Sequence, residues 1–188
     1  MTFNARKSAQ VIAFFISKSG GTSLNVVKAV KLVYLGDRCS IQKFGFPILD
    51  ETRVSMPKGP VNSSTYRHVN GDADLEASGW SEFLEDRAQH QIGAKQKFSA
   101  DDLDELSEAD IQCLEQVWAE FGEMNQWELV RYTHDRKNIP EWEDPNGSSN
   151  PIPLERIMTL LGIENADEQA ALVEEHRHID DVLDSLRA

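Results

Sequence analysis

The sequence predicts a mainly α-helical fold of the α+β class: a compact bundle of about six or seven helices with a small two- or three-stranded antiparallel sheet. Apolar residues recur at three- and four-residue steps along much of the 188-residue chain, which is the period of helices packed on one core. Only short segments, near 53–56 and between 80 and 94, have the pattern of extended chain. A chain of this length can bury a sizeable core without disulfides or metals.

The segment 24–37 is expected to form the central helix. Its apolar residues cover most of the circumference, which is typical of a helix buried inside a domain. A Ser-Gly-Gly break separates it from a first helix at 6–17, and Thr22 or Ser23 is expected to cap it. Because glycine costs stability inside a helix, Gly36 indicates that another backbone approaches closely at this position.

The elements that follow are expected to be short. The chain should leave the central helix over 41–47 and form a strand at 53–56. Pro60 follows a turn and can occupy the first position of a helix that runs to about Val69. Two short strands between residues 80 and 94 would then pair with the first strand and complete the sheet.

The second half is expected to add further helices around a long polar loop. A capping box from Ser107 to Asp110 starts the first of them, and Gly122 ends it. The other helices are expected at 125–133, 154–161 and 166–186, with the loop at 134–153. We expect a core domain at 1–162 and an acidic amphipathic C-terminal helix at 163–188, packed on that domain or on a partner.

Charge is distributed unevenly along the chain, whose formal net charge is −13. Residues 1–70 hold 10 Lys and Arg against 3 Asp and Glu, whereas residues 71–188 hold 9 against 29. The acidic excess argues against a protein that coats nucleic acid. The basic first third leaves room for an acidic or nucleic-acid partner on that face, and the alternative is that the two halves complement each other within the fold.

The sequence shows no secretory signal and no apolar run of membrane-spanning length, so a cytoplasmic location is expected. Cys39 and Cys113 show no paired spacing and are expected to be free, inert thiols rather than nucleophiles. His176 and His178 would point about 200° apart on a helix, which disfavours a shared metal ion. No enzymatic activity, metal or cofactor is therefore expected.

Contacts with a macromolecular partner are expected from exposed basic and aromatic side chains. The first choices are Lys58, Tyr66, Arg67 and Trp80, and the second choices are Lys28 and Lys31. Trp80 and Trp142 are either exposed anchors or side chains that pin their own loops to the body. The first two helices also have the spacing of a helix-turn-helix DNA reader, but the second is too apolar to offer side chains to base edges.

A more specific pattern consists of five segments in a fixed order: Lys31-Leu-Val-Tyr-Leu-Gly-Asp-Arg38, Met56-Pro-Lys-Gly-Pro-Val-Asn-Ser-Ser-Thr-Tyr66, Trp118-Ala-Glu-Phe121, Gln126-Trp-Glu-Leu-Val-Arg-Tyr-Thr-His134 and Pro140-Glu-Trp142. In this order they resemble the SocA-type antitoxin family, whose domain is also called Panacea and some of whose members are described as phage-associated proteins. The resemblance runs from about residue 6 to about residue 162.

The resemblance implies a non-enzymatic antitoxin of a toxin–antitoxin system with a role in phage defence. Its partner would be a cognate protein toxin, expected from the adjacent gene, that it neutralises by direct protein–protein interaction. The alternatives are a proteolytic adaptor that delivers the toxin to a ClpXP-type protease and a DNA-binding transcriptional regulator. The motif positions are mostly apolar or turn-forming, so we expect them to determine the fold, and the resemblance does not assign the partner-facing residues.

Overall fold

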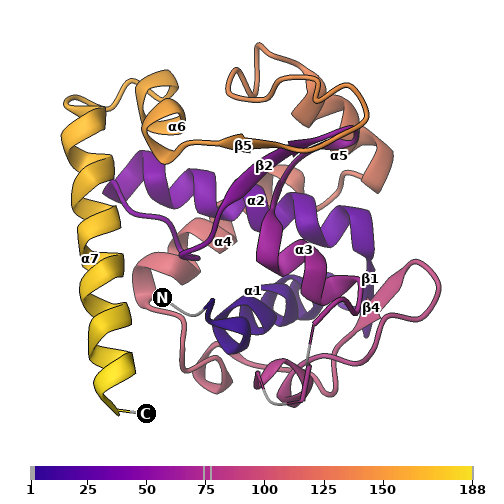
Figure 1. Ribbon diagram of the computed structural model, residues 1–188. Coiled ribbons are helices and arrows are strands. Elements are labelled where there is room, and N and C mark those ends of the chain that lie inside the picture. The colour runs from indigo at the N-terminus through magenta and orange to yellow at the C-terminus, as the bar shows by residue number, and fades with distance from the viewer. Residues whose placement is uncertain (1–2, 74, 77, 188) are drawn as a thin grey trace.

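A computed structural model describes residues 3–73, 75–76 and 78–187, apart from the side chains of residues 177, 178, 180, 181, 183–185 and 187. These residues form seven α-helices and two small antiparallel sheets, which confirms the predicted fold class (Figure 1). The helices are α1 (Ala5–Lys18), α2 (Val26–Phe44), α3 (Ser63–Val69), α4 (Glu108–Phe121), α5 (Gln126–His134), α6 (Leu154–Leu160) and α7 (Ala166–Arg187). The strands are β1 (Ser23–Asn25), β2 (Arg53–Met56), β3 (Gly59–Asn62), β4 (Gln91–Gly93) and β5 (Asn150–Ile152), and single turns of 3-10 helix lie at Trp80–Glu82 and Ala100–Asp102.

Helix α2 crosses the middle of the molecule, with α1, α4, α5 and β3 packed around it (Figure 1). Its start and its end both differ from the expectation. Leu24 belongs to strand β1, so the helix is capped by Asn25, whose side chain accepts hydrogen bonds from the backbone N–H groups of Val27 and Lys28. The helix also continues to Phe44, because Ile41 is buried in a second apolar cluster and Gly45, at φ 74°, supplies the left-handed end.

Gly36 marks the close packing of α2 against α4. A Cβ atom at this position would lie 2.9 Å from a methyl group of Leu114. The expectation of a close neighbour was right, but the neighbour is a side chain of α4 rather than another backbone. Helix α4 begins at the predicted capping box, in which Ser107 and Asp110 exchange hydrogen bonds with each other's backbone N–H groups.

The larger sheet has the strand order β3-β2-β5, and both neighbours run antiparallel to β2. The predicted partners between residues 80 and 94 are wrong, because β4 pairs with β1 instead. Pro60 lies in β3 rather than at a helix start, and Pro151 lies in β5, inside the segment predicted as loop. Both prolines are on edge strands, where a missing N–H breaks no ladder hydrogen bond.

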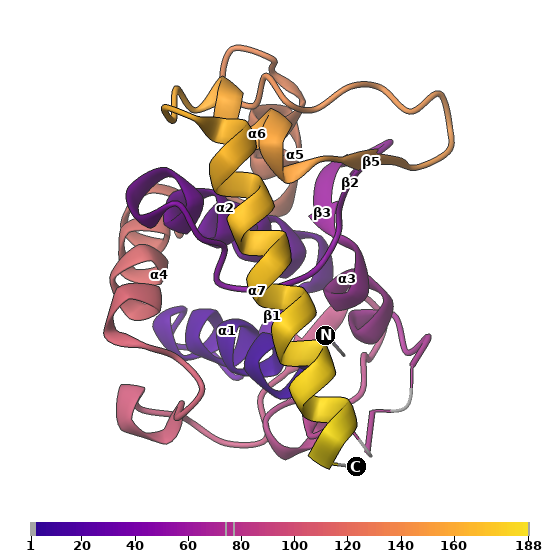
Figure 2. The same cartoon turned by 60° about the vertical axis from the view of Figure 1, so that its left-hand side comes forward.

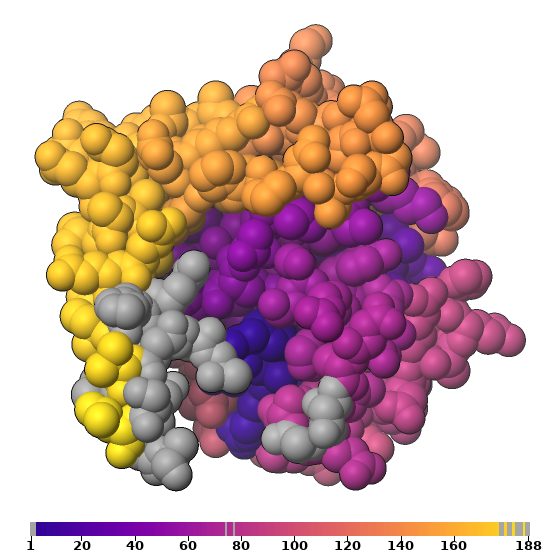
Figure 3. All heavy atoms as spheres, viewed as in Figure 1, coloured from indigo at the N-terminus to yellow at the C-terminus, as the bar shows by residue number. Residues whose placement is uncertain are grey.

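Two apolar clusters stabilise the described part of the chain. The larger one joins α1 and α2 to α4, α5 and the segments around the small sheets. The second joins Ile41 of α2 and Ile152 of β5 to α6 and to the first turns of α7, where Ala170 and Val173 are buried. Figure 2 shows α7 extending along one side of the molecule, and Figure 3 shows β5 and α6 covering one edge. The boundary between residues 162 and 163 stays a prediction.

Candidate partner-binding site

Three segments of the family-like pattern meet at the β2–β3 hairpin. Lys31 of α2 donates a hydrogen bond of 2.7 Å from Nζ to the carbonyl oxygen of Pro60. Gly59, at φ 92°, sits between this lysine and α5: a Cβ atom there would lie 2.9 Å from Lys31 Nζ and 2.5 Å from Thr133 Oγ1. The contact therefore requires glycine for both its backbone conformation and its lack of a side chain.

A buried carboxylate, Asp37, joins the same hairpin to α2. It accepts hydrogen bonds from Arg53 Nε and Nη2 at 2.9 and 2.7 Å, from Asn62 Nδ2 at 2.9 Å and from the backbone N–H of Leu49 at 2.8 Å. The side chains of Asp37 and Arg53 are 1% and 3% exposed. A charge pair this deep is tolerated because nearly every polar atom around it is bonded.

A second buried carboxylate, Glu141, joins α2 to the segment after α5. Its Oε1 accepts hydrogen bonds from the Tyr34 hydroxyl and from Arg38 Nε, both at 2.7 Å. Burial and the neighbouring Glu141 raise the pKa of Tyr34 well above its ordinary value. Trp142, next in sequence, donates from Nε1 to the carbonyl oxygen of Met56 at 3.1 Å. Trp142 therefore pins its own loop to the body, and the polar motif residues act as fold determinants.

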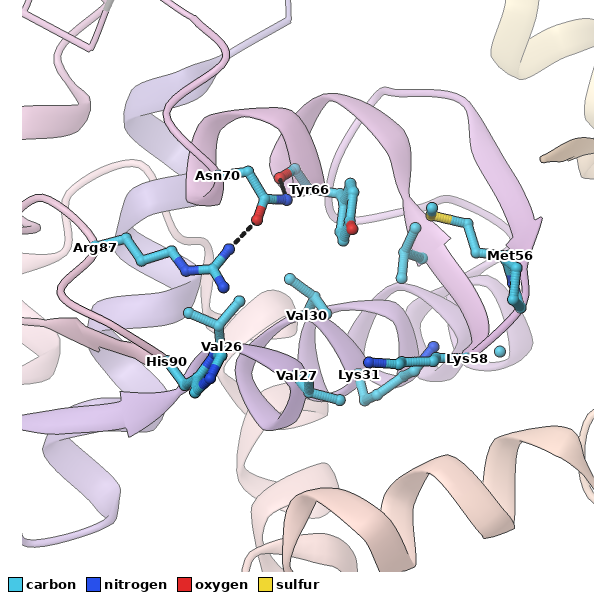
Figure 4. A pocket seen from close by; sticks show the side chains of 13 residues that line it. Val26, Val27, Val30, Lys31, Met56, Lys58, Tyr66, Asn70, Arg87 and His90 are labelled. Atoms are coloured by element: carbon cyan, nitrogen blue, oxygen red, sulfur yellow. Dashed lines mark hydrogen bonds between the residues drawn. The ribbon is translucent and has the colours of Figure 1, made fainter. Parts of the chain in front are cut away.

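Beside this network lies a solvent-open cavity of about 320 Å³, which we name the α2–hairpin pocket (Figure 4). It is lined by Val26, Val27, Val30 and Lys31 of α2, by Met56, Pro57, Lys58, Gly59 and Val61 of the hairpin, by Tyr66 and Asn70 at α3, and by Arg87 and His90. Val26, Val30 and Val61 are buried, and Tyr66 is half-buried. The pocket is thus an apolar hollow at the meeting point of three chain segments.

Basic groups supply all the formal charge of the pocket lining, which contains no Asp or Glu. Lys58 and Arg87 are exposed and lie on opposite sides of the opening in Figure 4. Arg87 donates a hydrogen bond to the Asn70 side chain, and Lys58 Nζ lies 5.7 Å from the ring centre of Trp127, which is 52% exposed. Burial lowers the pKa of Lys31 from its ordinary 10.5 to about 7.

The structure brings three of the six predicted contact residues, Lys31, Lys58 and Tyr66, into the pocket. These predictions were based on exposure and charge, and the expected exposure is wrong for Lys31 and Trp80, which are each 1% exposed. Trp80 packs in the core beside His68, with the ring centres 5.3 Å apart. Lysine's long apolar stem lets Lys31 cross the interior of the fold to its hydrogen bond, which no local pattern indicates.

The other two predicted contacts lie outside the pocket lining. Arg67 is exposed on α3, where its Nη2 donates to the carbonyl oxygen of Asp72 at 3.4 Å. Lys28 is half-buried and donates to the carbonyl oxygen of Gly122, with its Nζ 5.2 Å from the ring centre of Trp118. The role of all six residues as partner contacts stays a prediction.

Sequence reasoning missed the pocket residues on either side of the hairpin. Val26 and Val27 have the pattern of core residues, but they lie in the first turn of α2 and line the cavity. Arg87 and His90 lie in the region with the weakest periodicity, and the pairing of β4 with β1 brings them to the pocket. The one available signal was the basic charge of the first 70 residues, to which Lys31 and Lys58 belong.

Catalytic and metal-binding groups were also considered at the sequence level. Cys39 and Cys113 are free, and burial together with the neighbouring Cys39 raises the pKa of the Cys113 thiol, which disfavours the nucleophilic thiolate. Among the described residues, no cluster of three His, Cys, Asp or Glu is placed to hold a metal ion. The side chain of His178 lies outside the described residues. In the same part of the chain, no helix combines the length and apolar character of a membrane span.

Fold and pocket together define a small, mainly helical protein with an open pocket edged by basic side chains. The family model for the SocA-like antitoxins with a Panacea domain matches residues 30–143, which is more than half of the chain. The protein therefore belongs to the SocA-like antitoxin family. The match includes Asp37 and Glu141, the β2–β3 hairpin and α3. No curated protein and no solved structure matches the chain.

Proposed function

We propose that this protein is the antitoxin of a toxin–antitoxin pair and that it neutralises a cognate protein toxin, encoded by the adjacent gene, through direct binding. Membership of an antitoxin family is the observation that carries the proposal. In this proposal the protein acts in the cytoplasm without catalysing a reaction, and its effect depends on the surface that it presents.

The α2–hairpin pocket supports the choice of the binding face. The motif residues Lys31, Asp37 and Glu141 tie α2, the hairpin and the segment after α5 into one unit through buried hydrogen bonds. A surface held in this way loses little conformational entropy when a partner binds. Lys58 and Tyr66, two of the expected contact residues, lie on that unit.

A second candidate function is a proteolytic adaptor that delivers the toxin to a ClpXP-type protease. The observation that favours it is the apolar surface on α7, where Leu172, Ile179 and Leu186 are 46%, 48% and 78% exposed. Such a helix face is suited to docking in an apolar groove of another protein. A DNA-reading role is less well supported, because α2 is buried along much of its length against α1, α4, α5 and β3.

The test is co-expression with the product of the adjacent gene in a host whose growth that product arrests. An antitoxin restores growth and co-purifies with the toxin as a stable complex. The half-life of the toxin separates the two mechanisms, since an adaptor shortens it and a direct inhibitor does not. Absence of both rescue and co-purification would remove the antitoxin proposal.

A further inference from the structure

We propose that the α2–hairpin pocket binds a short segment of the toxin in which an apolar side chain is flanked by carboxylates. This inference rests on the proposed function, since it assumes a protein partner. It assigns to a defined place on this chain the chemical class of the segment that is recognised.

The apolar half of the segment is argued from the shape and lining of the pocket. Its volume of about 320 Å³ lies at the lower end of the range of roughly 300–1,000 Å³ for ligand pockets, which suits one or two side chains rather than a whole helix. Val26, Val30 and Val61 form the buried wall, and Val27 is half-buried at the opening. Water in such a hollow is displaced favourably by an apolar side chain.

The acidic half is argued from charge. Lys58 and Arg87 stand on opposite sides of the opening, so a bound side chain would have a cation near each flank (Figure 4). Lys31 and His90 are the other basic side chains of the lining, and no carboxylate of this chain lines the pocket although the chain carries a net charge of −13. This local excess of positive charge attracts acidic flanks and repels basic ones.

A second cavity of the protein lacks this combination. It measures about 470 Å³ and is lined by Gly20, Gly21, Lys95, Lys97 and others, with Glu85 among them. Its lining therefore combines lysines with a carboxylate of the same chain. Lys95 and Lys97 are exposed and provide a matched pair of cations outside the proposed site.

The experiment uses the full-length purified protein and three labelled peptides, in which Glu alternates with Leu, Glu with Ser, or Lys with Leu. Binding is measured by fluorescence anisotropy. We expect the Glu–Leu peptide to bind at least about tenfold more tightly than either control peptide, because only it offers both features. Equal binding of the Glu–Leu and Glu–Ser peptides would overturn the apolar half, and equal binding of the Glu–Leu and Lys–Leu peptides would overturn the acidic half.

The same titration is made with two double variants. Lys58→Glu with Arg87→Glu is expected to weaken binding of the Glu–Leu peptide by at least about tenfold, whereas Lys95→Glu with Lys97→Glu, which changes net charge equally, should alter it by less than about twofold. Equal losses in the two variants would reduce the effect to overall charge and overturn the site. All four positions are on the surface, and a thermal unfolding midpoint within about 3 °C of the wild type confirms that each variant is folded.

A second copy of this chain is the competing occupant, because α7 is itself acidic and carries exposed apolar residues. Light scattering over a range of protein concentrations decides this point. Self-association that Lys58→Glu with Arg87→Glu abolishes would assign the pocket to another copy and overturn the proposal, whereas a wild-type monomer supports it.

The peptide titration requires no toxin, so the two proposals fail separately. Peptide recognition without growth rescue would leave standing the preference of the pocket for an apolar side chain flanked by carboxylates, and would remove the antitoxin function together with the toxin as occupant. The Lys58→Glu with Arg87→Glu variant could still rescue growth although it no longer binds the peptide. That result would remove the pocket assignment and leave the antitoxin function.

Discussion

Lys31 Nζ donates a hydrogen bond of 2.7 Å to the carbonyl oxygen of Pro60, and this bond ties the buried helix α2 to the β2–β3 hairpin beneath the α2–hairpin pocket. The lysine is 1% exposed, and the group that accepts its hydrogen bond is a neutral carbonyl oxygen rather than a carboxylate. A buried lysine in this position makes the stability of the fold depend on pH. It also leaves no room for a side chain at Gly59.

Gly59→Ala is expected to destabilise the protein by about 2–4 kcal/mol, through backbone strain at φ 92° together with the clash of the new Cβ with Thr133 Oγ1 and Lys31 Nζ. Gly71→Ala is the matched control, because Gly71 has φ 78° but nothing within 4 Å of the added atom. That variant should lose only about 1–2 kcal/mol. Urea unfolding measures both, and equal losses would show that the close contact at Gly59 contributes nothing.

Lys31→Met is expected to remove a rise in stability between about pH 7 and pH 10. In the folded wild type, burial lowers the pKa of Lys31 to about 7 against an ordinary 10.5. Between these values the unfolded state binds more protons, so the free energy of unfolding rises with pH, by on the order of a few kcal/mol. Urea unfolding across this range should give a flatter curve for the variant. Parallel curves for wild type and variant would contradict the buried, deprotonating lysine.

Glu51 is expected to lower the free energy of unfolding as pH rises, which is opposite to the effect of Lys31 and occurs at lower pH. Burial raises its pKa from 4.5 to about 7, although Thr65 donates hydrogen bonds to it from both its backbone N–H and its hydroxyl. The folded state therefore binds more protons between these values, and stability falls as pH rises from 4.5 to 7. Glu51→Gln should flatten this part of the curve. Thermal unfolding at several pH values checks it, and an unchanged pH dependence in the variant would count against the prediction.

Asp37→Asn is expected to cost about 3–5 kcal/mol, because it leaves the Arg53 guanidinium buried without its counter-charge. The double variant Asp37→Asn with Arg53→Met should recover part of that loss. The exposed pair of Glu143 and Arg156, also 2.7 Å apart, is the control, and Glu143→Gln there should cost no more than about 1 kcal/mol. A double-mutant cycle by urea unfolding decides whether burial distinguishes the two pairs.

The helices could be predicted because their signals are local. The apolar period of α2 and the capping box before α4 depend on residues within a few turns of one another. Strand β5 has no such signal: of Asn150, Pro151 and Ile152 only the last is buried, and pairing with β2 defines the strand. Of the two strands predicted between residues 80 and 94, the second forms as β4, but it pairs with β1 rather than with β2. A short segment does not indicate which edge it will join.

The candidate site was predictable only in part. Lys58 and Tyr66 were expected at a partner surface from exposure and charge, and both line the pocket, although Tyr66 is half-buried. Asp37 and Glu141 have the residue type of surface groups, and their burial depends on arginine and tyrosine partners far away in the sequence. Buried polar bonding of this kind is decided by tertiary structure, so sequence pattern alone could not find it.

The most direct test of toxin neutralisation by direct binding is the dissociation constant between the purified toxin and this protein. We expect a stable one-to-one or higher complex whose dissociation constant rises by at least about tenfold in Lys58→Glu with Arg87→Glu and by less than about twofold in Lys95→Glu with Lys97→Glu. Neutralisation by binding would be contradicted if the toxin formed no measurable complex with the wild-type protein while the protein still protected the host.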